Sequence, residues 1–250
     1  MPKLYIVTGS SRGLGHSLCK FAVGEEGSRV LGLARGPSDL QSSKYSHLQC
    51  DLSSPSFAEA LDEALPRLLQ NNLENKFDSI ILVNNAGVLE PVGPLPDNSP
   101  KAIEKNIFVN LTAAIISTQV FLKHTKDLSC EKVIVNVTSG VAKNPKALWT
   151  SYSAAKAGLN AFSEALAKEL AEKSSGIRAK VICYEPGIID TQMQAEIREI
   201  PIERFPERDL FVQFKKDGSL RSPDAVAKIL MKRIQEMKTG DNVYYSVSQA

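Results

Sequence analysis

Short apolar runs alternate with helical stretches along the whole chain, and this alternation constrains the fold more than any other feature. The predicted strands cover residues 3–8, 29–34, 47–50, 79–83, 132–138, 179–183 and 242–246. Their apolar residues are continuous, which is typical of parallel strands covered by helices on both faces of a sheet. The predicted helices cover residues 14–24, 56–71, 99–124, 152–172 and 223–237. We therefore expect an α/β fold with a doubly wound, mostly parallel, seven-stranded sheet.

Size and composition fit a single domain over residues 1–250. The chain is 43% hydrophobic and 23% charged, which is enough apolar material for a sizeable core. The net charge is only +2, and no basic block is present, so neither nucleic acid nor a membrane surface is an expected partner. No apolar run approaches the length of a membrane span. The first predicted strand leaves no room for a signal peptide, so we expect a cytoplasmic location.

The cysteines and histidines do not predict a metal site. Cys19, Cys50, Cys130 and Cys183 are far apart and form no C-x-x-C pair, and the chain has only three histidines. We expect free thiols in a reducing compartment and no bound metal.

A glycine-rich segment follows the first predicted strand directly and opens the first predicted helix. It reads T-G-S-S-R-G-L-G over residues 8–15. Its glycines let the backbone turn tightly and bring N–H groups against a pyrophosphate at the helix N-terminus. A glycine-rich turn without a ligand is the alternative, but the position between strand and helix favours a dinucleotide site.

The end of the second predicted strand indicates which dinucleotide binds. A site for NAD places an acidic residue there to bind the ribose hydroxyl, whereas a 2′-phosphate requires a cation. The sequence reads L-G-L-A-R-G, with Arg35 and no acid at the strand end, and Arg12 in the glycine loop offers a second guanidinium. The alternative is two solvated surface arginines. We expect NADP(H).

The stretch S-Y-S-A-A-K, residues 151–156, places Tyr152 one helical turn before Lys156. A phenol donates a proton poorly near neutral pH, because its ordinary pKa is about 10. An ammonium within reach would lower that pKa and make the tyrosine a usable acid. The spacing alone is weak, because it also arises by chance in ordinary helices.

These motifs resemble those of the short-chain dehydrogenase/reductase family in both kind and order. The resemblance also includes D-L (51–52), N-N-A-G (84–87), Asn110, V-N-V-T-S-G with Ser139, and P-G-I-I-D-T (186–191). It covers essentially the whole chain and implies a Rossmann-type subunit. It further implies that subunits pair through helices near 99–124 and 152–172 into a homodimer or homotetramer.

The resemblance implies catalytic roles for Asn110, Ser139, Tyr152 and Lys156. Tyr152 would give a proton to the substrate oxygen, Ser139 would donate a hydrogen bond to it, Lys156 would lower the pKa of Tyr152, and Asn110 would hold a water that relays protons. Taken singly, Asn110 could be a satisfied core amide and Ser139 a strand-end cap. The implied cofactor contacts are Gly9, Ser11, Arg12, Gly13, Leu14, Gly15, Arg35, Asp51, Leu52, Asn85, Ala86, Gly87, Tyr152, Lys156, Pro186, Gly187, Ile189 and Thr191.

Within the family, the chain is most similar to the sepiapterin reductase and benzil reductase branch. The similarity is carried by residues 186–198, by F-K-K-D-G-S-L (214–220) and by K-N-P (143–145). It implies reduction of a ketone or vicinal dicarbonyl, with a helical lid at about 191–220. Ser139 and Tyr152 would touch the substrate, and the expected apolar walls are Leu89, Val141, Leu148, Trp149 and Met193. Core packing is the alternative for Trp149.

Three points stay open in the sequence. Sepiapterin reductases carry an acid close to the C-terminus, whereas this chain ends V-Y-Y-S-V-S-Q-A with only Asp241 nearby, so a broader carbonyl reductase is favoured. Glu185 beside the cofactor segment could exclude acidic substrates or point into solvent. The competing functions are an alcohol, steroid or polyol dehydrogenase, and a regulator that senses NADP(H) without turnover.

Overall fold

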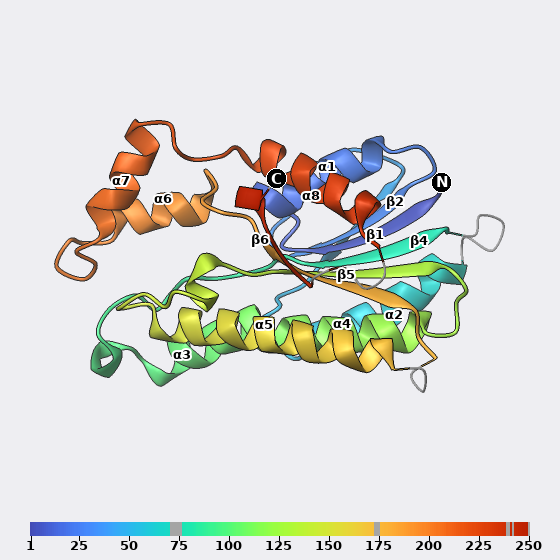
Figure 1. Ribbon diagram of the computed structural model, residues 1–250, viewed down its shortest axis with the longest axis horizontal. Helices are drawn as coiled ribbons and strands as arrows, with labels where there is room; N and C mark the ends of the chain where they lie inside the picture. The colour runs from blue at the N-terminus through green and yellow to red at the C-terminus, as the bar shows by residue number, and fades with distance from the viewer. Residues whose placement is uncertain (71–76, 173–175, 239–240, 242, 250) are drawn as a thin grey trace.

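The protein forms one parallel seven-stranded sheet, in strand order β3-β2-β1-β4-β5-β6-β7 (Figure 1). The computed structural model describes residues 1–70, 77–172, 176–238, 241 and 243–249. The strands are β1 (Lys3–Thr8), β2 (Arg29–Ala34), β3 (Tyr45–Gln49), β4 (Ser79–Asn84), β5 (Glu131–Val137), β6 (Ala179–Glu185) and β7 (Tyr244–Ser246). The predicted fold class is therefore confirmed. The strand predicted at 47–50 begins two residues earlier than expected, and residue 242 of the last predicted strand lies outside the described residues.

The strand order reverses direction between β1 and β4. The chain starts in the middle of the sheet, builds outward to β3, then returns and builds outward to β7 on the other side. At such a reversal the segments that follow the two central strands diverge and leave a crevice at the carboxyl edge of the sheet. The segments after β1 and β4, which contain the glycine loop and N-N-A-G, therefore lie side by side.

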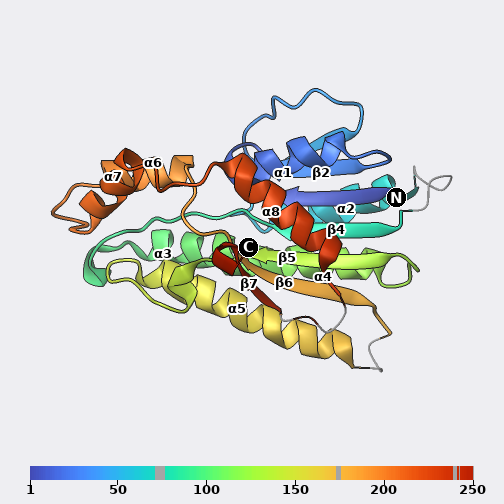
Figure 2. The same cartoon turned by 45° about the horizontal axis from the view of Figure 1, so that its top comes forward.

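Helices cover both faces of the sheet, as Figures 1 and 2 show from two directions. One face carries α1 (Gly13–Gly24) and α8 (Pro223–Glu236), and the other carries α2 (Ser56–Gln70), α3 (Pro100–Ile107), α4 (Ala113–Thr125) and α5 (Thr150–Ala171). Short 3₁₀ turns occur at Leu95–Asp97, Gly140–Ala142 and Val247–Gln249. Residue 71, which was predicted to end a helix, lies outside the described residues.

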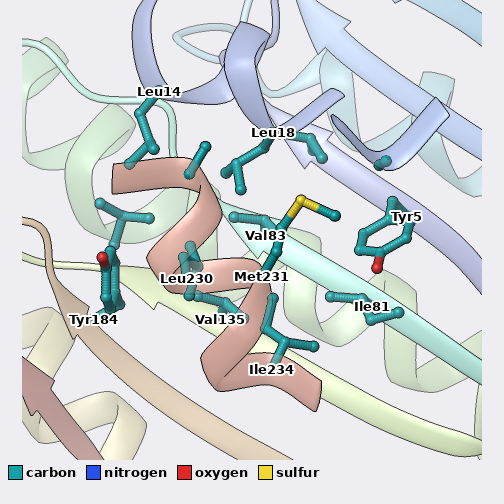
Figure 3. Packing of buried hydrophobic residues seen from close by; sticks show 14 of the residues in the cluster. Tyr5, Leu14, Leu18, Ile81, Val83, Val135, Tyr184, Leu230, Met231 and Ile234 are labelled. Carbon is teal, nitrogen blue, oxygen red and sulfur yellow. The ribbon is translucent and has the colours of Figure 1, made fainter. Parts of the chain in front are cut away.

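Alternate residues of each central strand fill two separate cores. In β1, Tyr5 and Val7 belong to the cluster under α1 and α8 (Figure 3), whereas Leu4 and Ile6 belong to the cluster under α2, α4 and α5. All four side chains are at most 3% exposed. Each such burial is worth about 1.5–3 kcal/mol relative to exposure, so a continuous apolar strand is stable only between two helical layers.

The helix predicted over residues 99–124 is interrupted. It starts after Ser99, whose side chain accepts a hydrogen bond from the Ala102 N–H, and it widens into a π-helical turn at Phe108–Thr112 before α4 continues to Thr125. The helical stretch predicted over 99–124 is therefore confirmed, and the π turn within it was not foreseen. π turns are rare and often occur at functional sites, and this one contains Asn110.

The expectation that no segment reaches the length of a membrane span also needs correction. By length and composition alone, the helical segment Pro100–Thr125 is long and apolar enough to cross a membrane. In the structure, however, α4 packs against α2 and the sheet, and Phe121 is fully buried in the core below α5. A core helix of an α/β domain accounts for this segment.

Residues 191–220 stand away from the sheet beyond its carboxyl edge (Figure 1). They contain two short helices, α6 (Gln192–Glu199) and α7 (Arg208–Lys216). Lys215 pairs with Asp190 at 2.6 Å, Lys146 pairs with Glu207, and an isolated bridge joins Ile189 to Arg221 at the base of the segment. We call residues 191–220 the distal segment.

Candidate active site

The loop between β1 and α1 has the geometry of a phosphate cradle. Gly9 and Gly13 adopt positive φ angles of 68° and 59°, a conformation that L side chains rarely adopt. A Cβ atom on Gly15 would lie 2.2 Å from the main-chain oxygen of Gly9. The tight turn therefore requires glycine at these positions. No side chain caps the first turn of α1, so its N–H groups fit an anion such as a pyrophosphate.

The segment after β4 fixes the glycine loop from the side. The hydroxyl of Thr8 accepts hydrogen bonds from the main-chain N–H groups of Asn85 and Ala86, both at 3.0 Å. The Asn85 amide donates to the main-chain oxygens of Thr8 and Gly9 at 3.0 and 3.3 Å. The predicted support of the cleft by residues 84–87 thus has a direct structural basis.

The two arginines expected at a 2′-phosphate make different contacts. Arg35 is exposed at the end of β2. Burial alone would raise the pKa of Asp51, but hydrogen bonds from Ser53, with smaller contributions from the charges of Arg35 and Lys105, hold it below its usual range. Arg12, whose side chain is 63% exposed, lies 3.8 Å from Glu196 of α6. The guanidinium of Arg12 therefore faces the distal segment in this structure.

Two predicted cofactor residues have side chains in the core. Leu14 belongs to the cluster below α8, and Leu52 packs with Phe57 and Ala113. Both are at most 6% exposed. These positions can therefore meet a cofactor only through their main chain, and their apolar side chains are explained by packing.

Ser139 and Tyr152 are brought together at the carboxyl edge of β5. The Tyr152 side chain is buried near that of Ser139. Burial is the larger influence and raises the pKa of Tyr152, while the nearby Ser139 hydroxyl partly opposes this. The sequence led us to expect a lowered pKa, and in this structure the direction is the opposite. The Ser139 hydroxyl also accepts a long hydrogen bond from the Val141 N–H. Ser139 therefore caps the turn after β5 in addition to facing Tyr152.

Lys156 is buried in the same cleft. Its Nζ atom donates to the main-chain oxygen of Val137 at 2.8 Å and lies 5.9 Å from the centre of the Tyr152 ring. Burial lowers the pKa of this ammonium to about 8. The ammonium therefore lies over the phenol ring and bonds to the sheet.

Asn110 holds the loop after β4. Its amide donates to the main-chain oxygens of Val88 and Asn106 at 2.7 and 2.9 Å, and its Oδ1 accepts from the Val88 N–H. A Cβ atom on Gly87 would lie 2.9 Å from that Oδ1 and 3.9 Å from Nζ of Lys156. Asn110 is thus a satisfied amide that also faces the cleft.

Sequence reasoning missed Asn106. Its amide donates to the main-chain oxygens of Val88, Leu89 and Glu90, all within 3.2 Å. The available signal was a second asparagine four residues before Asn110 on an otherwise apolar helical face. Two buried amides one turn apart fix the loop that carries Leu89.

The predicted substrate residues form one apolar cluster over Tyr152. Val141, Trp149 and Leu89 are buried there, and Leu148 and Met193 pack against it. The distal segment adds Ile197, Ile200, Phe205 and Phe211. The ring of Trp149 lies 6.0 Å from that of Tyr152 and 5.3 Å from that of Phe205, measured between ring centres. We call this set the aromatic cluster.

The strand β6 leads into the segment expected along the nicotinamide. Gly187 has a φ of 69°, Pro186 is buried, and the Thr191 methyl group faces Gly13, where a Cβ atom would be 3.3 Å away. This contact brings the two ends of the proposed cofactor groove together.

Glu185 does not point into solvent. It is half-buried and accepts a hydrogen bond from the Tyr244 hydroxyl through Oε2. Its Oε1 atom would lie 3.0 Å from a Cβ atom on Gly140, the residue after Ser139. Sequence reasoning left this orientation open, and the structure places the carboxylate beside the Ser139 loop.

A crevice of this kind on a doubly wound parallel sheet defines a nucleotide-binding α/β protein. Residues 3–201 match the short chain dehydrogenase family, and the chain belongs to that family. It is similar to benzil reductase ((S)-benzoin forming) of Bacillus subtilis, with 33% identity over 242 residues and 97% of each chain covered. The Bacillus cereus protein of the same name is 33% identical over 229 residues, covering 90% of this chain and 91% of the relative.

Solved structures agree with this assignment. A short chain dehydrogenase/reductase from Saccharomyces cerevisiae superposes with a TM-score of 0.81 at 26% identity, covering 98% of this chain and 95% of the other. The KRED1-Pglu enzyme superposes with a TM-score of 0.79 at 25% identity, covering 97% and 100%. The Rossmann-like fold of a short-chain dehydrogenase/reductase is therefore established for this chain.

Proposed function

We propose that the protein is an NADPH-dependent carbonyl reductase that converts a vicinal diketone such as benzil to the hydroxyketone, with Tyr152 as the proton donor. The observation that carries this proposal is the buried Tyr152, which lies near Ser139 and within the aromatic cluster. The benzil reductase relatives support the substrate class.

The bound nicotinamide would supply a hydride to the carbonyl carbon. Ser139 donates a hydrogen bond to the carbonyl oxygen as negative charge develops on it. Tyr152 then gives its proton to that oxygen. The lowered pKa of Lys156 lets its ammonium exchange protons near neutral pH, so Lys156 can reprotonate Tyr152. A water held by Asn110 would in turn supply the proton to Lys156.

The cofactor groove fits the proposal in shape and charge. The glycine loop turns so tightly that a Cβ atom on Gly9 or Gly15 would clash with neighbouring residues, and it leads into the uncapped first turn of α1, where a pyrophosphate can bind. Arg35 at the end of β2 offers a guanidinium to a 2′-phosphate, and no acidic residue stands at that strand end to repel it. These features support NADPH rather than NADH.

The distal segment is proposed to act as a lid. Its side chains Phe205 and Phe211 pack against Trp149 in the same cluster as Tyr152, and Tyr152 is only 7% exposed. Exclusion of water strengthens the hydrogen bonds made to the reacting oxygen. Its ion pairs to Lys146 and Asp190 are largely exposed, so each contributes little to closure.

The proposal includes two further parts. Free thiols at Cys19, Cys50, Cys130 and Cys183 fit a cytoplasmic location. Pairing of subunits along α4 and α5 into a dimer or tetramer is expected for a member of this family.

The test is a substrate panel with purified protein. NADPH absorbance is followed with benzil, a simple diketone and sepiapterin, and each is repeated with NADH. We expect turnover of benzil with NADPH and a lower kcat/KM with NADH. An absence of NADPH oxidation with every carbonyl would favour the regulator, and oxidation of alcohols or steroids without carbonyl reduction would favour a dehydrogenase.

A further inference from the structure

The only tryptophan of the chain carries a buried donor with no partner. Trp149 is 5% exposed, and its indole N–H makes no hydrogen bond to any described residue. A buried donor without an acceptor costs about 1–3 kcal/mol of folding stability. Such a group calls for an explanation, and beside a reacting centre a ligand atom that completes the bonding is one.

The backbone around Trp149 also has unfavourable features, namely an N-cap without a side-chain hydrogen bond and a positive φ angle at Leu148. Trp149 occupies the N-cap of α5, where Ser, Thr, Asp or Asn would hydrogen-bond the first turn, and it provides no such bond. Leu148 before it has a φ of 67°, an unfavourable conformation for a branched apolar residue, and its oxygen accepts a bond from the Gly93 N–H at 3.0 Å. Strain of this kind concentrates at functional sites.

These features hold the indole ring next to the reacting centre. Trp149 lies three residues before Tyr152 on the same helix start, and its main-chain oxygen accepts the Ser153 N–H at 2.8 Å. The two rings meet edge to face, with 6.0 Å between their centres. The indole ring therefore lines the surroundings of Tyr152, where a substrate would bind.

We infer that the indole N–H of Trp149 donates a hydrogen bond to the second oxygen of a vicinal dicarbonyl, while Ser139 and Tyr152 hold the first. This inference rests on the proposed carbonyl reduction. NADPH gives a hydride to one carbonyl carbon, Tyr152 gives a proton to its oxygen, and the products are the hydroxyketone and NADP⁺. The second oxygen is unchanged and stays bonded to Trp149. A monoketone leaves the donor unsatisfied and is therefore a poorer substrate.

A purely structural role for the N–H makes a different prediction. The Oε1 atom of Gln194 on α6 is also buried and has no hydrogen-bond partner among the described residues, and the Gln194 amide donates to the Phe211 oxygen at 3.3 Å. The Phe211 ring lies 5.6 Å from that of Trp149. A small shift of the distal segment could join Trp149 to Gln194. That bond would affect every substrate alike.

The test compares benzil with deoxybenzoin, which replaces one carbonyl by a methylene group and is otherwise the same size. For Trp149→Phe, kcat/KM for benzil should fall about tenfold or more, the cost of one lost hydrogen bond to a buried acceptor, while deoxybenzoin changes less than about threefold. Phe205→Leu is the control, since it alters the same cluster without a polar atom and should affect both ketones equally.

A second form of the experiment does not depend on the folding of that variant. Because the chain has one tryptophan, biosynthetic replacement by benzothienylalanine removes only this N–H and keeps the bicyclic ring. An equal loss on both ketones, or no change on either, would overturn the inference and leave the reductase proposal intact. If the unmodified protein reduces neither ketone, the proposed function fails and the inference fails with it.

Discussion

The Nζ atom of Lys156 on α5 is hydrogen-bonded to the main-chain oxygen of Val137 at the end of β5, at 2.8 Å. The bond ties the helix that carries Tyr152 to the strand that leads to Ser139. The same ammonium is buried, and burial lowers its pKa to about 8. One residue therefore couples the geometry of the site to the pH of the solution.

The first prediction concerns stability and pH. The unfolded chain keeps the Lys156 proton up to its ordinary pKa of 10.5, whereas the folded protein releases it near 8. Between these values the unfolded state binds more protons, so the contribution of Lys156 to stability increases with pH, by at most about 1.4 kcal/mol per unit. Denaturant unfolding at several pH values should show a steeper rise for wild type than for Lys156→Met. If the free energy of unfolding rose equally steeply with pH in both proteins, the lowered pKa of the buried Lys156 would be contradicted.

The second prediction concerns the proton donor. Tyr152→Phe keeps the ring in its buried contact with Trp149 but removes the hydroxyl group. General acid catalysis contributes about 10²–10⁴-fold, so kcat for benzil should fall by at least a hundredfold. Cofactor binding, measured by NADPH fluorescence, should change little. Turnover within a few-fold of wild type would exclude Tyr152 as the acid.

The third prediction concerns the cofactor. In Arg35→Asp, the carboxylate repels a 2′-phosphate and can accept a bond from a ribose hydroxyl. The ratio of kcat/KM for NADPH to that for NADH should fall by about 100-fold or more, as expected for losing a charge-assisted contact and adding a repulsion. Arg67→Asp on α2, where the side chain is 74% exposed, is the charge-matched control. An unchanged ratio for the first variant would reject Arg35 as the phosphate ligand.

The fourth prediction concerns Glu185, whose carboxylate faces Gly140 beside Ser139. It should disfavour anionic substrates at the reacting centre. In Glu185→Gln, kcat/KM for phenylglyoxylate should rise about 5- to 10-fold relative to its neutral methyl ester. The expected effect is modest because a positive charge lies nearby: the Lys143 ammonium is 3.1 Å from the centre of the ring of Tyr244, the residue that hydrogen-bonds Glu185.

Glu59→Gln on α2 is the matched control, because Glu59 is exposed and lies on a helix away from Ser139. It removes the same charge and should leave the phenylglyoxylate ratio unchanged. If both variants raise the ratio equally, the effect belongs to net charge and not to Glu185.

Local patterns were sufficient to predict the sheet. Continuous apolar runs such as residues 79–83 can be stable only between two helical layers. A capping serine followed by a proline predicts the start of a helix, and Ser222-Pro223 does start α8. The glycine loop was also predictable from the sequence. Glycine is the residue that most readily adopts positive φ, so glycines between a strand and a helix indicate a tight turn, and Gly9 and Gly13 do adopt positive φ.

Other features depend on contacts between distant segments and could not be predicted. The direction of the Tyr152 pKa shift is set by burial, in a cluster to which the distal segment contributes Phe205 and Phe211. The partner of Glu185 is Tyr244, 59 residues away. Local spacing contains no information about either.

The widened turn at Phe108–Thr112 has a consequence for how this chain can be altered. A π turn accommodates one residue more than an α-helical turn, so it offsets the residues before it from those after it by about 100° around the helix axis. Deleting a single residue there would allow a regular helix but would rotate either Asn106 away from the Val88 loop or Phe121 away from the sheet. Length at this point of the chain is therefore as constrained as residue identity.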